Sequence, residues 1–385
     1  MKTNIMTTAA LTRYDELRDA MKEHGAHSLA YSTLQTDMKY HSCSSGYLAY
    51  RVLRDGQTVA VLGDPVCAFH DLEDCLVGFL DIHPHAIFLQ ISQTTAGTLQ
   101  RLGHYVNPFG KECWLDINPP LRSSAETFSV QGPKRERLRT TRNRCRREGI
   151  RIKEMQLSEI DAAILVDISR EWLSTKLVGT ELQFLARPLA GKPITEENTP
   201  EGEDFALQEE DGVRLFVALS RANEVIGFVI FDPMYRYGRV ESYVTSILRC
   251  RRTYKNPASP TTPRKVPSGL VDAIILGAVE QFRREGVQAV SLGLMPFAPV
   301  RSNGRTKFQS NPLTAILFES LYRFGRSLFN FKNLTWHKRR YFGREEPVYF
   351  AAPQKIAQLW HLHQANRMMG VRYLEALRNA VAGRR

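Results

Sequence analysis

The chain has 385 residues, of which 43% are hydrophobic and 24% are charged, a composition that fits two globular domains and excludes a disordered chain. Lys and Arg number 52 against 40 Asp and Glu, and this formal net charge of +12 favours a polyanion or an anionic surface as partner where the cations are clustered. No apolar run approaches the roughly 20 residues that span a bilayer, and Met1 to Thr12 lacks the apolar core of a secretory signal, so we expect a cytoplasmic protein.

The first third of the chain alternates helical and extended patterns. An amphipathic helix is predicted from Tyr14 to His24. Alternating segments at Gly46 to Leu53 and Thr58 to Gly63, joined by a turn at Asp55-Gly56, predict a β-hairpin. The further expected elements are helices at Asp71 to Ile82 and Thr95 to Leu102 and strands at Ala86 to Ile91 and Glu112 to Leu115. Because helices interleave with strands, we expect an α/β or α+β sheet domain.

A loosened segment with Pro and Ser residues, Asn118 to Ser129, predicts a domain boundary, so we assign residues 1–125 to an N-terminal and 126–385 to a C-terminal domain. Beyond it we expect helices at Lys134 to Glu148, Leu157 to Ser174, Pro267 to Glu285 and Leu313 to Phe329, a polar loop at Thr195 to Asp204, and strands at Arg214 to Ser220, Val225 to Phe231, Arg239 to Ile247 and Ala289 to Gly293. Three strands, a helix, a strand and a helix resemble the element order of GNAT-type acetyltransferases. We therefore predict two such domains in tandem.

The six cysteines show no pair at Cys-x-x-Cys spacing and no Cys/His spacing typical of zinc sites. We therefore interpret them as reduced structural thiols and expect no metal centre. They are Cys43, Cys67, Cys75, Cys113, Cys145 and Cys250.

Positive charge is concentrated between Lys134 and Lys153, where ten basic residues are opposed by Glu136 and Glu148 alone. On a helix this density covers more than one face, and the resulting repulsion is relieved when a polyanion lies nearby. A solvated basic helix is the alternative. We predict that this segment contacts phosphates of a nucleic acid or an anionic lipid. The residues assigned to that role are Arg142, Asn143, Arg144 and Arg147.

A second cationic cluster, Lys338, Arg339 and Arg340, follows Trp336 and precedes Tyr341-Phe342. This mixture suits a single-stranded nucleic-acid end, whose bases stack on aromatic rings while its phosphates pair with cations. We therefore expect Trp336 and Arg339 to contact the nucleic acid. Polar neighbours place Lys338 and Arg340 near the surface in this interpretation.

Several short motifs, taken in order from about Tyr14 to Pro353, resemble the cytosolic synthase domain of phosphatidylglycerol lysyltransferases. They are Gly63-Asp64-Pro65, Leu138 to Gly149, Trp172-Leu173, Gly227-Phe228, Ser291 to Pro296 and the late cationic cluster before Tyr349-Phe350. The resemblance implies two acetyltransferase-like domains with the donor site in the second, an aminoacyl-tRNA as donor, no metal or cofactor, and an acceptor hydroxyl, usually on phosphatidylglycerol. Peripheral contact with the inner membrane face would follow. The membrane members carry a transmembrane flippase before this domain, and this sequence shows none.

The resemblance also suggests roles for single residues. Lys338 and Arg340 match two late lysines of the family and become donor-side candidates. The family's Asp-Leu-Met-Arg segment reads Ser246-Ile247-Leu248-Arg249 here, so the arginine remains as a catalytic candidate while Ser246 replaces the carboxylate in the substrate site. Apart from the resemblance, the possible general bases are Asp64, Asp232 and Glu241, of which we assign Asp232 and Glu241 to the catalytic site. Arg249 could instead be a surface arginine paired with an acid, and all three acids are of a type common at turns and surfaces.

The donor is further constrained between Arg249 and Gly269. Coenzyme A enzymes of the acetyltransferase fold bind pyrophosphate with a glycine-spaced loop that opens a helix. Here the segment is long, basic and Pro-rich, so we do not expect a coenzyme A thioester as donor. Three functions stay open: an aminoacyl-tRNA-dependent aminoacyltransferase with a lipid or small-molecule acceptor, a coenzyme A-dependent N-acyltransferase, and a noncatalytic RNA-binding protein.

The predicted helix from Leu313 to Phe329 carries many large apolar residues. A buried core helix explains this composition. The alternative is an apolar face that docks on a bilayer, supported by basic residues at its border.

Overall fold

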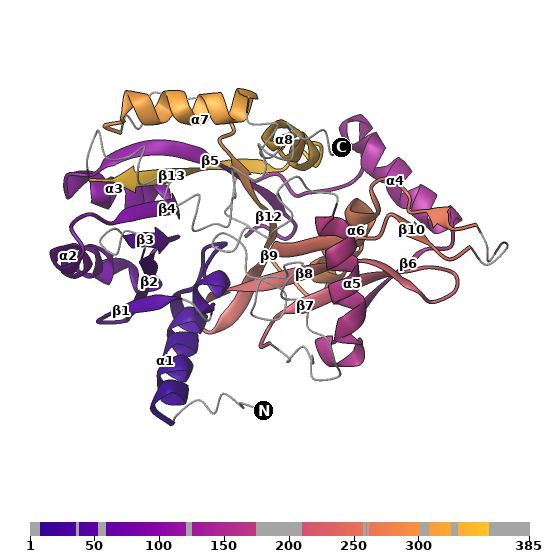
Figure 1. Cartoon of the computed structure of the whole chain (residues 1–385), viewed down its shortest axis with the longest axis horizontal. Coiled ribbons are helices and arrows are strands. Elements are labelled where there is room, and N and C mark those ends of the chain that lie inside the picture. The colour runs from indigo at the N-terminus through magenta and orange to yellow at the C-terminus, as the bar shows by residue number, and fades with distance from the viewer. Residues whose placement is uncertain are drawn as a thin grey trace.

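The computed structural model describes residues 8–35, 38–52, 59–120, 125–174, 210–256, 259, 262–300, 308–324 and 330–353. Within this part a mixed sheet of eleven strands runs across the whole molecule (Figure 1). The strand order is β1-β2-β3-β4-β13-β5-β12-β9-β8-β7-β6. Helices cover both faces of the sheet. None of the helices in the described ranges is long and apolar enough to cross a membrane.

The first half of the sheet is built from the elements up to residue 116. They are α1 (Thr8–His24), β1 (Lys39–Cys43), β2 (Gly46–Val52), β3 (Val59–Leu62), α2 (Leu72–Ile82), β4 (Ile87–Ile91), α3 (Gln93–Arg101) and β5 (Tyr105–Asp116), with short 3-10 turns at Tyr31–Leu34 and Phe69–Asp71. Ser92 begins α3 as its N-cap, because its hydroxyl accepts a hydrogen bond from the backbone N–H of Thr95.

The second half follows from residue 133. Its elements are α4 (Glu136–Arg147), β6 (Arg151–Met155), α5 (Ala162–Leu173), β7 (Arg214–Leu219), β8 (Val225–Arg236), β9 (Arg239–Cys250), α6 (Leu270–Arg284), β12 (Ala289–Pro296), α7 (Pro312–Phe324), α8 (Phe331–Arg339) and β13 (Arg344–Ala352), with 3-10 turns at Pro133–Arg135 and Leu157–Glu159. A separate small ribbon pairs β10 (Thr253–Tyr254) with β11 (Arg264–Lys265).

The two halves repeat one topology. In the first, β1, β2 and β3 form an antiparallel meander, and β4 then returns through α2 to pair with β3 in parallel. In the second, β6 to β9 form an antiparallel meander, and β12 returns through α6 to pair with β9 in parallel. This arrangement confirms the predicted α/β class with two acetyltransferase-like halves.

Two strands join the halves into one sheet. The last described strand, β13, inserts between β4 and β5, and β5 pairs on its other edge with β12. The C-terminal strand therefore lies among strands of the first half. The boundary between residues 125 and 126 stays a prediction, since hydrogen bonds run continuously across the sheet on both sides of it.

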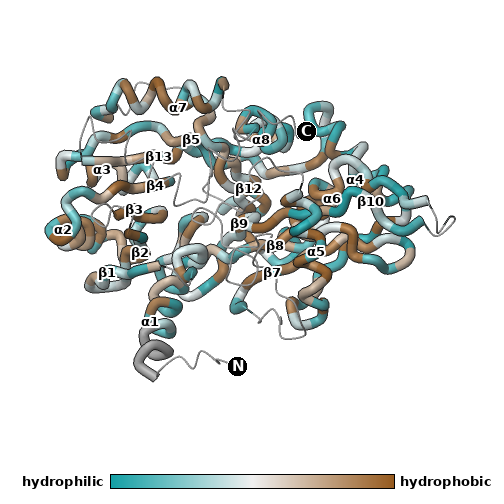
Figure 2. Tube along the Cα trace, viewed as in Figure 1, coloured by the Kyte–Doolittle hydropathy of each residue, from teal (hydrophilic) through white to brown (hydrophobic). Residues whose placement is uncertain are grey.

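Alternating side chains build separate cores on the two faces of the sheet. In the first half, α1 and α7 cover one face and α2 and α3 the other. In the second half, α4 and α6 cover one face and α5 the other. Phe282 of α6 stacks on Tyr243 of β9 with ring centres 4.4 Å apart, which anchors α6 on the sheet. Figure 2 shows many hydrophobic residues, in brown, along the strands of the sheet.

Most of the sequence-based elements are present, with informative differences. The strand expected at Glu112 to Leu115 runs over the whole of β5, because register shifts opposite Pro108 and Gly110 allow these turn-forming residues inside a strand. We did not predict β1, β6, β13 or α8. The Asp55-Gly56 turn, the loop at residues 195–204 and the end of the helix expected up to Phe329 lie outside the described residues.

Candidate active site where the parallel strands part

The second-half junction is the place where β9 and β12 separate. The strands pair in parallel only over Ala289–Ser291 and Ser242–Val244. Beyond these residues β9 stays paired with β8, and β12 stays paired with β5. A strand bulge and a positive φ of 77° at Gly293 mark the separation. The buried hydroxyl of Thr245, next on β9, has no hydrogen-bond partner among the described residues.

Lys338 of α8 reaches this junction. Its Nζ donates a hydrogen bond to the carbonyl of Leu294, 2.8 Å away. A side-chain carbon at Gly293 would lie 3.4 Å from the same nitrogen, an ordinary contact, so it is the positive φ and not a lack of space that favours glycine here. Burial lowers the pKa of Lys338 to about 8, although Cys113 and Glu112 act in the opposite direction. The amine can therefore lose or gain a proton near neutral pH.

Glu112 of β5 lies on the first-half side of Lys338. It is 5% exposed, and its Oε1 accepts hydrogen bonds from the hydroxyl of Ser28 and from the amide of Gln90, the latter at 2.7 Å. Burial raises the pKa of Glu112, while these two donors and the charge of Lys338 lower it. A buried, hydrogen-bonded carboxyl group of the first half thus interacts through its charge with the amine at the second-half junction.

The first-half junction has the corresponding backbone. Here β3 and β4 pair in parallel over Ala60–Leu62 and Ile87–Leu89, and the Gly63-Asp64-Pro65 turn follows β3. The carboxylate of Asp64 accepts the backbone N–H of Ser92 at 2.8 Å. Burial lowers the pKa of His27, which packs so closely on Gly63 that a Cβ there would lie 2.8 Å from its ring.

Arg249 lies near the end of β9, beyond the last residue that pairs with β12. Its guanidinium stacks over the ring of Trp172 of α5, 3.8 Å from the ring centre. Its Nη1 donates to the carbonyl of Leu248. Ser246, on the same stretch, donates its hydroxyl hydrogen to the carbonyl of Ile230 at 3.2 Å. Arg249 and Ser246 therefore belong to the stretch of β9 that has separated from β12.

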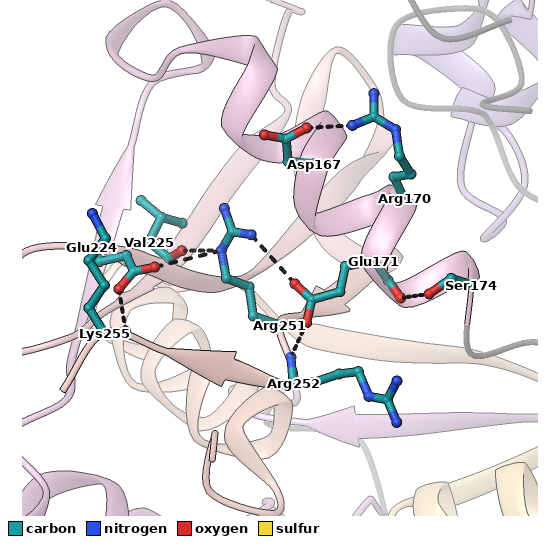
Figure 3. Close-up of polar contacts among 9 residues, drawn as sticks. All are labelled: Asp167, Arg170, Glu171, Ser174, Glu224, Val225, Arg251, Arg252 and Lys255. Carbon is teal, nitrogen blue, oxygen red and sulfur yellow. Dashed lines mark hydrogen bonds and ion pairs between the residues drawn. The ribbon is translucent and has the colours of Figure 1, made fainter. Parts of the chain in front are cut away.

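The basic segment after Arg249 is held by two acids (Figure 3). Glu171 of α5 accepts the backbone N–H of Arg252 at 2.7 Å and pairs with the Arg251 guanidinium at 3.5 Å. Glu224 accepts the backbone N–H of Lys255 at 3.0 Å. These contacts connect the segment to the end of α5 and so keep Trp172 beside Arg249.

The two proposed bases lie in different places. Glu241 is near the start of β9 and pairs with Arg236 at 3.0 Å. Eight residues of strand separate it from Arg249, which corresponds to roughly 26 Å. Asp232 of β8 is 1% exposed and lies opposite Val244, the last residue of β9 that pairs with β12. Of the two acids, only Asp232 comes near the junction.

Trp336 connects α8 with the basic helix α4. The guanidinium carbons of Arg137 and Arg340 lie 4.6 and 5.6 Å from its ring centre, and the residue is 44% exposed. Arg339 pairs with Glu345 at 2.6 Å and remains 43% exposed. The two cationic clusters of the sequence therefore form one continuous surface, with an aromatic ring between them.

Arg340 is more buried than we expected. It pairs with Asp272 at the start of α6, and the hydroxyl of Tyr341 donates to the same carboxylate at 2.6 Å. The side chains of Arg340 and Asp272 are 14% and 5% exposed. The expectation of a surface position was wrong for Arg340, because α6, remote in sequence, supplies a buried partner. Lys338 is partly buried as well.

The basic helix α4 is partly neutralised. Arg142 pairs with Glu280 of α6 at 2.6 Å, and Arg144 pairs with Glu148 at 3.1 Å. The sequence analysis counted only the acids between Lys134 and Lys153. It therefore missed Glu280, which lies on α6 and meets α4 only in the folded chain. The exposed basic residues between Lys134 and Lys153 are Lys134, Arg137, Arg144, Arg146, Arg147, Arg151 and Lys153, and Asn143 is exposed among them.

The N-terminus of α6 is filled by the protein itself. A Cβ at Gly269, its N-cap, would lie 2.6 Å from Thr141 of α4 and 3.0 Å from the carboxylate of Asp272. The acid Asp272 therefore occupies the first turn of α6, at the helix end that would otherwise favour an anion. The close packing around Gly269 is consistent with the sequence between Arg249 and Gly269, which lacks the glycine spacing of a pyrophosphate-binding loop.

Sequence reasoning missed several members of the site. Glu112 lies on β5, Gln90 on β4 and Ser28 in the turn after α1, while Asp272 lies in the first turn of α6. No spacing in the sequence predicts that these residues come together. Glu112 alone could have been suspected, because it is a charged residue in a strand that is otherwise largely buried.

The chain is similar to known proteins over most of its length. A family model described as phosphatidylglycerol lysyltransferase, C-terminal, matches residues 18–352. A phosphatidylglycerol lysyltransferase of Bacillus subtilis (strain 168) is 24% identical over 335 residues, which are 85% of this chain and 33% of that protein. The chain thus spans about a third of the length of this relative.

Two solved structures have a similar fold. L-PGS from Bacillus licheniformis superimposes with a TM-score of 0.66 at 21% identity, covering 93% of this chain and 97% of the other. The C-terminal domain of a putative lysylphosphatidylglycerol synthetase from Agrobacterium fabrum gives 0.64 at 19% identity, covering 92% and 96%. At these identities the likeness shows a shared fold.

Proposed function

The chain belongs to the phosphatidylglycerol lysyltransferase C-terminal family, and from this premise we propose that it transfers an aminoacyl group from aminoacyl-tRNA to a hydroxyl of a phosphatidylglycerol-like lipid. In this reaction the lipid oxygen bonds to the aminoacyl carbonyl carbon, and the ester bond to the terminal ribose of the tRNA breaks. The proton of the lipid hydroxyl ends on the departing ribose oxygen. Because the donor is already an activated ester, the protein must hold its end, stabilise the oxyanion and guide one proton.

The observation that carries the proposal is the enclosed amine of Lys338 where β9 and β12 part. Among the described residues the carbonyl of Leu294 accepts one of its hydrogens, so the ammonium can donate others to an oxyanion in the opening. Arg249, on the separated stretch of β9, supplies a second cation held over Trp172. Asp232 is the candidate base nearest to this place.

The tRNA end is proposed to lie on the surface formed by α4 and α8. Trp336 offers a ring for a base, and Arg137 beside it offers a charge for a phosphate. Arg144 and Arg147 extend the positive surface along α4, which is markedly hydrophilic in Figure 2. Arg339 keeps an exposed guanidinium edge although it pairs with Glu345.

The lipid acceptor is proposed to approach along α7. Leu313, Ile316 and Phe324 are 54%, 60% and 77% exposed, and their spacing puts them on one side of the helix. Phe318, on the opposite side, packs into the first-half core, so the helix is both a core helix and an apolar surface. Figure 1 shows α7 along one outer edge of the molecule, and it contacts α8. We propose peripheral contact with the cytoplasmic membrane face here.

The test is an aminoacyl transfer assay. The protein is incubated with radiolabelled aminoacyl-tRNAs and phosphatidylglycerol vesicles, and the lipid extract is resolved by chromatography. We expect label in a lipid that depends on phosphatidylglycerol and disappears after ribonuclease treatment of the donor. Label from acetyl-coenzyme A instead would support an N-acyltransferase, which the filled N-terminus of α6 opposes. Binding of tRNA without transfer to lipid or to added small molecules would support an RNA-binding protein and contradict the proposal.

A further inference from the structure

Three cysteines from three separate elements converge in the first half. Cys43 ends β1, Cys67 follows β3, and Cys75 lies on α2. Their three sulfur atoms all lie within 4.8 Å of one another. Cys75 is buried, while Cys43 and Cys67 are partly exposed. This cluster is separate from the residues assigned to aminoacyl transfer.

The backbone holds the first two cysteines in place. Tyr47 and Val66 exchange two backbone hydrogen bonds of 2.9 and 2.8 Å, which join the β1–β2 hairpin to the segment of Cys67. A Cβ at Gly46 would lie 1.9 Å from the carbonyl oxygen of Val66, so only glycine permits this approach. The hydroxyl of Ser45 also accepts the backbone N–H of Ala68 at 2.9 Å. The thiols are therefore positioned before any ligand binds.

We propose that Cys43, Cys67 and Cys75 form a three-thiolate site for a thiophilic metal ion, with Zn²⁺ as the expected occupant. Two sulfurs bound to one zinc at about 2.3 Å with tetrahedral angles are roughly 3.8 Å apart. The largest separation allowed by the cluster exceeds this by about 1 Å, which rotation of the side chains can close.

The surroundings suit such an ion. Three cysteine sulfurs within 4.8 Å of one another offer the soft sulfur ligands that Zn²⁺ prefers. Cys75 packs with Leu76 and Phe79 in the apolar core under α2, so the buried side of the site is shielded from water. The partly exposed side, where Cys43 and Cys67 lie, leaves the fourth position of a tetrahedral ion to solvent.

The ion would join three parts of the first half to one another: the β1–β2 hairpin, the segment after Gly63-Asp64-Pro65, and α2. Cys67 is three residues after Asp64, so the site would also steady the first-half junction. Because metal ligation by thiols displaces their protons, binding should release protons and raise the thermal stability of the folded chain.

The experiment begins with the full chain, reduced and stripped of metal with a chelator. Zn²⁺ is titrated by calorimetry, and Co²⁺ is used as a spectroscopic probe of thiolate ligation. We expect one equivalent of either ion, a thiolate-to-cobalt charge-transfer band that Zn²⁺ abolishes, and a higher melting temperature with Zn²⁺. The single variants Cys43→Ser, Cys67→Ser and Cys75→Ser should each weaken binding by more than about 100-fold, the upper end for losing an outer-shell partner.

The control is Cys250→Ser, which removes a thiol of similar exposure in the second half and should keep full binding. If Cys75→Ser fails to fold, the partly exposed positions 43 and 67 decide the outcome, with circular dichroism to verify their folding. Unchanged binding in folded Cys43→Ser and Cys67→Ser would overturn the proposal. So would the absence of saturable Zn²⁺ or Co²⁺ binding, or a chain that only forms a Cys43–Cys67 disulfide on oxidation.

Discussion

The first-half junction, where β3 and β4 part, and the second-half junction, where β9 and β12 part, share a backbone arrangement and differ in their side chains. In the first, Asp64 accepts the N–H of Ser92 and Gln90 donates to Glu112. In the second, Gly293 carries no side chain, the Thr245 hydroxyl has no partner among the described residues, and the Lys338 amine enters from α8. A junction whose polar groups are hydrogen-bonded stabilises the fold, whereas one with available donors can act on a substrate.

The largest expected effect concerns the support of α8, which delivers Lys338 to the second junction. Arg340→Ala leaves the carboxylate of Asp272 buried with Tyr341 as its remaining partner, so we expect a loss of about 3–5 kcal/mol in the free energy of unfolding. Chemical denaturation measures it. Arg339→Ala is the control on the same helix, since its pair is 43% exposed on the arginine side and should cost about 0–1 kcal/mol. Equal stability of the two variants would contradict the buried pair.

The next effect is on transfer itself. Lys338→Ala removes the amine from the second junction, and we expect turnover to fall by roughly a hundredfold or more, since such donors contribute about 2.7–4 kcal/mol in the transition state. The affinity for tRNA should change little, because the phosphate-binding surface lies on α4 and around Trp336. Single-turnover rates and tRNA binding are measured side by side. A folded Lys338→Ala protein with near wild-type turnover would place the chemistry elsewhere.

The first junction should behave in the opposite way. Asp64→Ala removes the acceptor for the N–H of Ser92, the N-cap of α3, and should cost about 1–3 kcal/mol of stability. Turnover measured below the melting temperature should stay within about tenfold of wild type. A variant that folds as stably as wild type but transfers no aminoacyl group would reverse the roles of the two junctions.

The pH dependence tests the link between the halves. With the pKa of Lys338 at about 8, turnover that needs the ammonium falls as pH rises through that value. The charge of Glu112 raises this pKa, so Glu112→Gln should move the midpoint to lower pH. Glu346→Gln, an exposed acid of β13, is the control and should leave it in place. A midpoint unmoved in Glu112→Gln would remove Glu112 from the site.

The free energy of unfolding should also depend on pH through the protonation of Lys338, and the direction of this dependence can be predicted. The pKa of Lys338 is lowered from 10.5 to about 8 in the folded chain, so between these values the folded protein loses its proton before the unfolded chain does. The cost of burying the charge then disappears, and this contribution makes stability rise with pH through that window. Denaturation of wild type and Lys338→Met across the window measures it as the difference between the two slopes.

The smallest effect concerns the tRNA surface outside both junctions. Arg144→Ala with Arg147→Ala should weaken tRNA binding and reduce the slope of log affinity against log salt by about 1 for each phosphate that is no longer neutralised. Arg142→Ala is the matched control, because its guanidinium pairs with Glu280 and its side chain is only 19% exposed, whereas the side chain of Arg144 is 52% exposed although it pairs with Glu148. A double variant with an unchanged salt slope would show that α4 is a solvated basic helix.

The sequence determined most of the local elements, the repeated α/β order, the family and the two cationic clusters, because helix and strand periodicity and motif spacing depend on residues near one another in the chain. Only the tertiary structure decided that β13 inserts between β4 and β5, that the charges of Glu112 and Lys338 interact, and that Arg340 has a buried partner. It also brought together three thiols whose spacing matched no zinc motif. These pairings join segments up to more than two hundred residues apart, and they form because strands complete their hydrogen bonds and buried charges need partners, requirements that only the packed sheet imposes.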